Sequence, residues 1–286
     1  MEATQAAANG EQASDLHGVN VLLMGPAGTG KTHSIGTLVD AGVEVFYLGL
    51  EPGLESLLGY WKDKSKEIPE NVHWHQLEAP KASFSELLDS ANKINTMALD
   101  SLAKMQDPHR SKHNHFIKLL TALNDFPDDR TGQKFGCVDT WKPSRALVID
   151  GMAGLSRAAM SLVVGGKPVR NQSDWGIAQD QVEKIVRMWT DNCHCHFVLI
   201  AHVERETDAV LGGVKIMVST LGKALGPKLP PMFSDVILTV REGSKFSWDT
   251  GSALADVKTR NLPIASGQNA DFGPIIKKWQ SRGGVL

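Results

Sequence analysis

Eight consecutive residues have the types and spacing that bind phosphate. They follow the pattern G-x-x-x-x-G-K-[ST], in which glycines let backbone N–H groups turn inward around phosphate oxygens. The lysine of this pattern reaches the terminal phosphates of a nucleotide, and the helix that follows adds its positive end. The sequence therefore predicts a nucleotide site, formed by Gly25, Pro26, Ala27, Gly28, Thr29, Gly30, Lys31 and Thr32.

A carboxylate for a metal ion is found further along the chain. The apolar run at residues 146–149 ends in Asp150, and an aspartate in this position holds Mg²⁺ in P-loop proteins. The hydroxyl of Thr32 is a second oxygen ligand for the same ion. Together the two segments predict a Mg-ATP site with Thr32 and Asp150 at the metal and Lys31 at the phosphates.

Hydrolysis also needs a group that orients the attacking water. Glu51 ends a second apolar run, where it would face the nucleotide, although it is also suited to a turn before Pro52-Gly53. His202 ends another run and could sense the terminal phosphate, or it could be a strand-end histidine in a polar pocket. The residue after Asp150 is a glycine, which favours Glu51, on the neighbouring strand, as the base.

These residues need strands to position them. Short apolar runs along the chain predict buried strands. They lie at residues 19–24, 43–50, 146–149, 197–201 and 236–240, with a further one at 71–77. Helical patterns at 31–40 and 177–189 lie between them, and a capping box at Ser83 starts a long helix that extends to about residue 105. This alternation predicts an α/β fold with a mostly parallel central sheet flanked by helices.

The chain is expected to form one domain, over residues 18–286, after a disordered leader at 1–17. The stretch 107–143 is polar, rich in histidine and broken by Pro and Gly, so it is interpreted as a surface insertion. No apolar run reaches the ~18 residues of a membrane span, and no membrane association is expected.

Composition limits the remaining classes. The 286 residues carry 30 basic and 32 acidic side chains, a net charge of −2 that excludes a polycation but not local basic patches. The three cysteines fit a reducing compartment. The run from Cys193 to His196 invites a metal interpretation, but strand alternation and the missing second cluster favour buried packing. His109, His113 and His115 are interpreted as part of a basic surface.

The ordered set of segments resembles a known family. Residues 25–32, Glu51, the strand ending at Asp150, Ile200-Ala-His202 and Lys258-Thr-Arg260 are similar to the RecA/RadA-like core ATPases. More narrowly, the chain resembles the phage nucleotide-binding proteins of the AAA-24 type, which include the Sak single-strand annealing proteins. The resemblance spans residues 18–273 and implies Glu51 as the catalytic base. It also implies that Lys258 and Arg260 act on ATP bound by a neighbouring subunit of a homo-oligomer, ring or filament. The segment 107–143 has no counterpart in it.

Two segments without acidic residues are candidates for binding DNA. They follow strands whose ends face the nucleotide, and in RecA-like proteins DNA-contacting loops leave the sheet at corresponding places. Lysines and arginines in glycine-rich loops suit contacts to phosphates, although solvated basic loops are an equally common alternative. The candidates are Arg157, Lys167 and Arg170 in residues 151–173, and Lys215, Lys223 and Lys228 in residues 209–234.

The leading functional prediction is an ATP-dependent recombination or annealing protein that assembles on single-stranded DNA. We expect it in the cytoplasm, that of the bacterial host if it is phage-encoded, with a single-strand-binding protein as a further possible partner. One alternative is an annealing scaffold that binds ATP but hydrolyses it little. The other is a small-molecule P-loop kinase, which needs an arginine-rich lid that the sequence does not present.

Overall fold

A central sheet of eight strands organises the protein. The computed structural model describes residues 16–78, 83–105, 110–207 and 212–286. Along the sheet the strand order is β10-β9-β8-β1-β5-β4-β2-β3, and a separate hairpin pairs β6 with β7. Six strands pair in parallel: β1, β2, β3, β4, β5 and β8. At one end of the sheet, β9 pairs antiparallel with β8, and β10 pairs antiparallel with β9. The expected α/β fold is confirmed. The strands are β1 Asn20–Met24, β2 Glu44–Gly49, β3 Val72–Gln76, β4 Arg145–Asp150, β5 His196–Ala201, β6 Val203–Thr207, β7 Val214–Val218, β8 Asp235–Glu242, β9 Lys245–Asp249 and β10 Gln268–Asn269.

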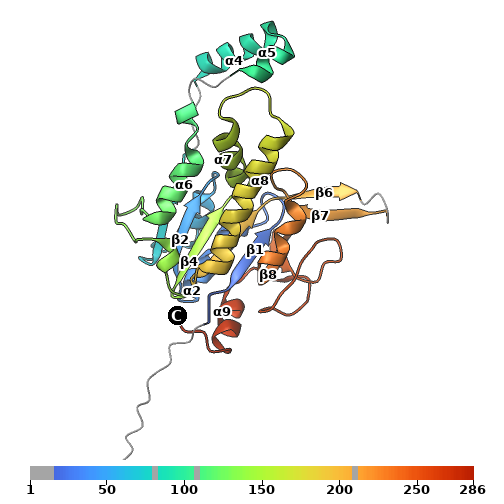
Figure 1. Ribbon diagram of the computed structural model, residues 1–286. Helices are drawn as coiled ribbons and strands as arrows, with labels where there is room; N and C mark the ends of the chain where they lie inside the picture. Colours follow the sequence, from blue (N-terminus) through green and yellow to red (C-terminus); the bar gives the residue numbers. More distant parts are fainter. Residues whose placement is uncertain (1–15, 79–82, 106–109, 208–211) are drawn as a thin grey trace, which may run out of the picture.

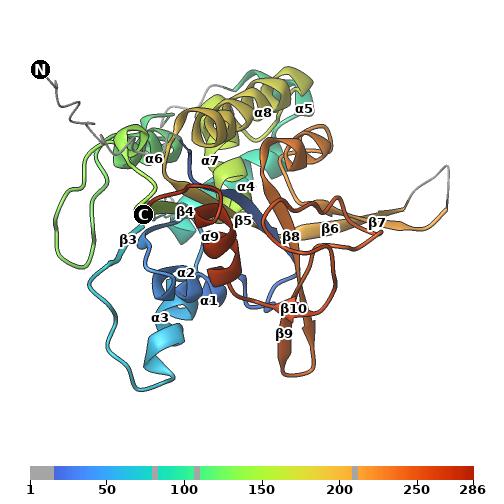
Figure 2. The ribbon, with the colours of Figure 1, turned by 90° about the horizontal axis from the view of Figure 1, so that it is seen from below.

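Helices cover both faces of the sheet. In Figure 2, α6, α7 and α8 lie on one side of it, and α1, α2, α3 and α9 lie on the other. The helices are α1 Lys31–Ser34, α2 Gly36–Asp40, α3 Leu54–Lys62, α4 Phe84–Thr96, α5 Leu99–Lys104, α6 His115–Asn124, α7 Met152–Val164, α8 Gln172–Arg187 and α9 Gly273–Gln280. A five-residue π-helical turn, Met188–Asn192, extends α8.

Side-chain alternation along each strand divides the core into two layers. In β1, Leu22 and Met24 pack with α6–α8, while Val21 and Leu23 pack with α1–α3 and α9. This follows from the two-residue period of a strand, and it explains why the strands read as continuous apolar runs. Every central strand is therefore buried on both faces.

The segment 107–143 does more than the expected surface insertion. Its helix α6 and the chain that follows place Phe116, Leu119, Phe126 and Trp141 in the core layer beside α7, each no more than 3% exposed. The prediction of a surface insertion is therefore wrong for this part of the segment. The sequence shows a helical patch at Phe116, Leu119, Leu120 and Leu123, but the polar composition around it favoured a surface position, whereas α6 is buried on one side.

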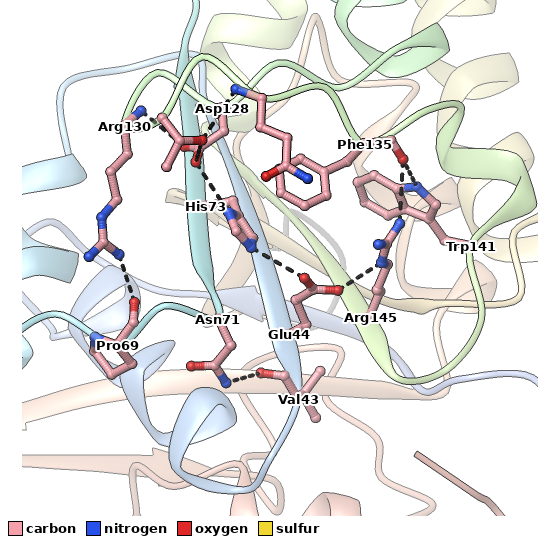
Figure 3. Close-up of polar contacts among 12 residues, drawn as sticks. Val43, Glu44, Pro69, Asn71, His73, Asp128, Arg130, Phe135, Trp141 and Arg145 are labelled. Atoms are coloured by element: carbon pink, nitrogen blue, oxygen red, sulfur yellow. Dashed lines mark hydrogen bonds and ion pairs between the residues drawn. The ribbon is translucent and has the colours of Figure 1, made fainter.

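A polar network fixes this segment to the sheet (Figure 3). His73 of β3 contacts Asp128 at 3.2 Å and Glu44 of β2 at 3.3 Å. The second oxygen of Glu44 accepts a bond from Nε of Arg145 at 2.7 Å. Hydrogen bonds from Thr131, from His73 and from backbone N–H groups outweigh the opposing effect of burial, the largest single influence, and lower the pKa of Asp128. The network ties β2, β3 and β4 together at their amino ends, away from the P-loop.

The long helix expected over residues 83–105 is two helices. The capping box at Ser83 is present, but α4 ends at Thr96 and the extended residues Met97 and Ala98 separate it from α5. No residue of α4 is buried, and both helices stand apart from the sheet in Figure 1. The apolar spacing of this segment thus predicts a helix correctly, but the apolar side of that helix is not buried.

Most of the expected leader, residues 1–15, lies outside the described residues. Within the described ranges, every helix falls short of the length and apolar character that a membrane crossing requires.

Candidate nucleotide site

The phosphate-binding loop connects β1 to α1 as the sequence predicts. Gly28 and Gly30 have φ angles of 71° and 79°, in the left-handed region that side chains disfavour. Gly25 is needed for a different reason, since a Cβ there would lie 2.0 Å from Oγ1 of Thr239 on β8. The loop therefore closes tightly against the sheet and directs its backbone toward the start of α1.

Lys31 lies within this loop. Its ammonium donates hydrogen bonds to the carbonyl oxygens of Gly25 at 2.8 Å and Pro26 at 2.7 Å. Burial lowers the pKa of Lys31 to about 8, and the negative charges of Asp150 and Glu51 oppose that shift. A bound polyphosphate would favour the charged ammonium, so this lysine is suited to exchange its carbonyl partners for phosphate oxygens.

The two proposed metal ligands meet. Oγ1 of Thr32 donates a hydrogen bond to Oδ2 of Asp150 at 2.6 Å. The fold therefore brings the hydroxyl and the carboxylate, which are distant in the sequence, into direct contact. The hydroxyl of Tyr47 on β2 also donates to Oδ2, at 2.9 Å. Burial raises the pKa of Asp150, an effect that the bonds from Thr32 and Tyr47 oppose. An oxygen-only pair of this kind fits Mg²⁺, which takes one or two protein carboxylates beside water and phosphate.

Sequence reasoning missed Tyr47. It lies inside an apolar strand and looks like any buried aromatic residue. Burial, followed by the charge of Asp150 and the hydrogen bond to it, raises the pKa of its hydroxyl. No sequence pattern marks it, because the contact depends on strand register: β2 and β4 are neighbours, with Tyr47 opposite Val148 and Gly49 opposite Asp150.

Glu51 also reaches the site. It follows β2, and its side chain lies across the backbone of Gly151, where a Cβ would be 2.2 Å from its Oε2. Gly151 has a φ of 151° and precedes α7. The other carboxylate oxygen of Glu51 accepts a hydrogen bond from Nη2 of Arg157 at 2.7 Å. The glutamate expected to orient water is thus held in an ion pair with a residue expected to bind DNA.

Lys31, Thr32, Glu51 and Asp150 border one cleft at the carboxyl edge of the sheet, with a volume of about 990 Å³. His202 lies on its border and is exposed, and its carbonyl accepts a bond from the backbone of Ser219. Tyr60 and Phe246 also border the cleft, and neither was singled out from the sequence. The ring of Phe246 lies 3.1 Å from the position of a Cβ on Gly30, so β9 covers one side of the loop.

Lys258 and Arg260 lie elsewhere. Lys258 bridges to Val236 near the amino end of β8, and the backbone N–H of Arg260 donates to Asp235 at 2.9 Å. Asp235 is fully buried and is opposite Val21 near the start of β1, at the edge of the sheet away from the P-loop. The two cations therefore do not act on the cleft of their own chain. Their role toward a neighbouring subunit stays a prediction.

The six cations expected to bind DNA are divided by the structure. A second hollow of about 630 Å³ lies between α7, the start of α8 and the loop after β7, and we call it the α7–α8 pocket. Arg157, Arg170 and Lys223 line this pocket. The other three do not: Lys167 follows α7, Lys215 pairs with Asp256 at 2.8 Å, and Lys228 pairs with Glu183 at 2.9 Å.

Segments free of acid in the sequence are therefore not free of acid in space. Lys223, besides lining the pocket, pairs with Glu206 at 3.0 Å. Four of the six cations pair with a carboxylate from another segment: Glu51 after β2, Glu206 of β6, Glu183 of α8 and Asp256. Part of the segment 209–234, at 209–211, lies outside the described residues.

The cysteine and histidine run is packed into the protein. Cys193, Cys195 and His196 are at most 4% exposed, and burial raises the pKa of the two thiols to about 11 and about 12. Nδ1 of His196 accepts a bond from the backbone of Val19, and burial lowers its pKa to about 4. Across the described ranges no three His, Cys, Asp or Glu side chains group to hold a metal ion. His109 lies outside the described residues.

Comparisons with known proteins place the chain. A search of curated proteins finds no match. Among solved structures, the RadB recombinase matches with 13% identity and a TM-score of 0.35, over 87% of this chain and 85% of that chain. The family profile of AAA_24, described as "AAA domain", matches residues 17–263, a range that begins before β1 and includes the P-loop, Glu51, Asp150, His202 and both cations at 258 and 260. The chain therefore belongs to the AAA_24 family, whose model spans the P-loop and the whole parallel sheet of this fold.

Proposed function

We propose that the protein hydrolyses Mg-ATP with Glu51 orienting the attacking water, and that this activity serves recombination or annealing of single-stranded DNA. One observation carries the catalytic part: Lys31, the Thr32–Asp150 pair and Glu51, from three separate segments, border the same cleft. A cation for the phosphates, an oxygen pair for a metal and a carboxylate for water are the parts that phosphoryl transfer to water requires.

Thr32 and Asp150 would hold Mg²⁺, which neutralises charge on the phosphates when it is bound. The hydrogen bond from Tyr47 holds Asp150 in orientation for that task. Lys31 binds the terminal phosphates, and Glu51 accepts a hydrogen bond from water on the β2 side of the cleft.

The DNA part rests on charge and position. Arg157, Arg170 and Lys223 gather in the α7–α8 pocket, which neighbours the nucleotide cleft across Glu51. Cations of this kind bind the phosphate backbone without regard to sequence. Lys167, Lys215 and Lys228 are peripheral contacts in this proposal.

We expect the protein to assemble as a homo-oligomer, and the position of Lys258 and Arg260 supports that expectation. The two residues lie beside the amino end of β8, away from their own cleft, and in a head-to-tail homo-oligomer they would face the cleft of the next copy. Cations supplied across a subunit boundary stabilise transition-state charge and couple hydrolysis to assembly. Such a head-to-tail arrangement can close into a ring or extend as a filament, with or without a single-strand-binding protein.

A second function is favoured by one contact. The ion pair with Arg157 occupies a carboxylate oxygen of Glu51, which would slow hydrolysis in the free protein. An annealing scaffold that binds ATP and turns it over slowly is therefore the alternative.

The deciding experiment measures the ATPase rate with and without a thymidine oligonucleotide, and the molar mass by light scattering with a non-hydrolysable ATP analogue. The proposal predicts a rate that rises with the oligonucleotide and a mass that rises with the analogue. ATP binding with negligible turnover in both conditions would favour the scaffold. Turnover indifferent to DNA, in a protein that stays monomeric, would contradict both.

A further inference from the structure

The α7–α8 pocket and the nucleotide cleft share one ion pair. Arg157 borders the pocket and Glu51 borders the cleft, and their side chains meet at 2.7 Å. The two partners differ in burial: the side chain of Arg157 is 67% exposed and that of Glu51 is 17% exposed. The arginine therefore reaches the glutamate from the solvent side, and it is the partner that a ligand can remove.

The pocket has the chemistry of a site for one nucleotide of a single strand. The cations Arg157, Arg170 and Lys223 line it, together with the indole of Trp175. The guanidinium of Arg170 lies 5.9 Å from the centre of the Trp175 ring. Cations beside an aromatic face are the combination with which proteins hold the phosphates and stack the bases of single strands. The volume, about 630 Å³, lies within the range of about 300–1,000 Å³ typical of small-ligand sites.

A buried hydroxyl adds an independent sign of a ligand. Ser156, one residue before Arg157, lines the pocket and is 6% exposed. Its Oγ is buried with no hydrogen-bond partner among the described residues. Buried polar atoms are rarely left without a partner, and a bound phosphate oxygen or base edge would supply one.

The pocket is not purely cationic. Glu204 of β6 lines it, and Glu206 pairs with Lys223. With Arg157 held by Glu51 as well, the free pocket has part of its positive charge neutralised. A phosphodiester must therefore compete with carboxylates, and the competition at Arg157 is the one that alters the cleft.

We propose that the Arg157–Glu51 ion pair is an autoinhibitory contact, broken when a phosphodiester of single-stranded DNA enters the α7–α8 pocket and binds Arg157. A guanidinium pairs with a phosphate through two parallel N–H···O bonds, which gives the phosphodiester an advantage over the contact from Nη2 to Glu51. Released from Arg157, Glu51 keeps its place over Gly151 and accepts a hydrogen bond from water instead. Arg157 is thus a positioning residue that acts through Glu51. The inference rests on the proposed function, because it assigns Glu51 to the attacking water.

The first test is Arg157→Gln without DNA. An exposed ion pair shifts the equilibrium between its paired and unpaired states by a few-fold. Removing the pair should therefore raise the fraction of unpaired Glu51, and with it basal kcat, by about two- to fivefold. KM for ATP should stay unchanged, because Arg157 does not border the nucleotide cleft. A thymidine oligonucleotide should then give no further stimulation, whereas Arg157→Lys should restore part of both the inhibition and the stimulation.

The matched control is Arg187→Gln. Arg187 forms an ion pair with Glu183 on α8 at 3.1 Å, with exposed fractions of 54% and 21%, and neither residue borders either pocket. Its kcat and its stimulation by the oligonucleotide should equal those of the wild type. Thermal melting of all variants checks folding.

Three outcomes separate the claims. If Glu51→Gln keeps wild-type turnover, the proposed role of Glu51 fails. If Glu51→Gln is inactive but Arg157→Gln has wild-type or lower basal kcat, the autoinhibitory contact is refuted while the proposed function stands. If inorganic phosphate, at the same phosphate concentration and ionic strength, stimulates the wild type as much as the oligonucleotide does, DNA is not the occupant. The double variant Arg157→Gln/Glu51→Gln should be as inactive as Glu51→Gln alone.

Discussion

Removing one hydroxyl from β2 should destabilise the nucleotide site in a pH-dependent way. Tyr47→Phe deletes the donor 2.9 Å from Oδ2 of Asp150 and leaves the ring in place. Tyr47 is fully buried and Asp150 is 7% exposed, so water cannot replace the lost bond without rearrangement. A hydrogen bond to a charged group contributes about 1.5–3 kcal/mol. A loss of about 2 kcal/mol corresponds to a fall in Tm of about 4–8 °C for a chain of this size.

The pH dependence follows from Asp150. Its pKa is raised in the folded protein, chiefly by burial, so the folded state holds a proton that the unfolded state has lost between the ordinary aspartate pKa, about 3.9, and the folded value. The free energy of unfolding therefore falls as pH rises through that window. Losing the Tyr47 donor raises the pKa of Asp150 further. The penalty of Tyr47→Phe should consequently grow from about 1 kcal/mol at pH 4 to the full value near neutrality.

Urea unfolding of wild type and Tyr47→Phe at both pH values measures this difference. Tyr60→Phe is the matched control, because Tyr60 also borders the cleft but donates to Asp40 at an exposed position. Its effect should stay below about 1 kcal/mol at both pH values. A Tyr47→Phe penalty that equals that of Tyr60→Phe, or that does not change with pH, would refute the assigned role of the tyrosine.

Three further predictions concern the two pockets. The pKa of Lys31 is about 8, and bound phosphates would raise it, so the Kd for ATP should increase about tenfold between pH 7 and pH 9. Calorimetry at the two pH values measures this change, and an unchanged Kd would contradict it. Gly151→Ala should lower kcat by about 10–100-fold with ATP affinity retained, because its Cβ would displace the carboxylate of Glu51; wild-type kcat would show that this position of Glu51 is irrelevant. Lys223→Ala should weaken single-strand binding and reduce the slope of log K against log salt concentration by about one. Lys228→Ala, which lies outside the α7–α8 pocket, should have a smaller effect on both. Equal losses of affinity and slope in a salt titration would argue against the pocket.

The sequence predicted the parts of the fold that depend on local pattern. The apolar runs that became β1, β2, β4, β5 and β8 are buried on both faces, so their continuity was informative. The P-loop and Asp150 were predictable because phosphate and metal chemistry demands fixed residue types. The strand ends also placed Glu51 and His202 at the sheet edge that borders the cleft, since parallel strands bring their carboxyl ends together.

What could not be predicted depends on contacts between distant segments. The apolar stripe of α4 has the same pattern as a buried helix, yet Phe84 and Leu88 are 91% and 61% exposed. Phe126 and Trp141 are buried within a stretch whose composition suggested a surface loop. Arg157 stands in a segment without acids, and only the fold brings Glu51 to it. Sequence spacing does not carry information on such partners.

The proposed role of Glu51 is to orient water for ATP hydrolysis in the cleft beside Lys31. The most direct measurement is phosphate release by Glu51→Gln, with ATP binding followed in parallel and with Glu55→Gln as control, because Glu55 borders the same cleft from α3. Glu51→Gln should bind ATP within about twofold of the wild type but release phosphate about 10²–10⁴-fold more slowly, with Glu55→Gln unaffected. Phosphate release by Glu51→Gln at the wild-type rate would rule out this role for Glu51.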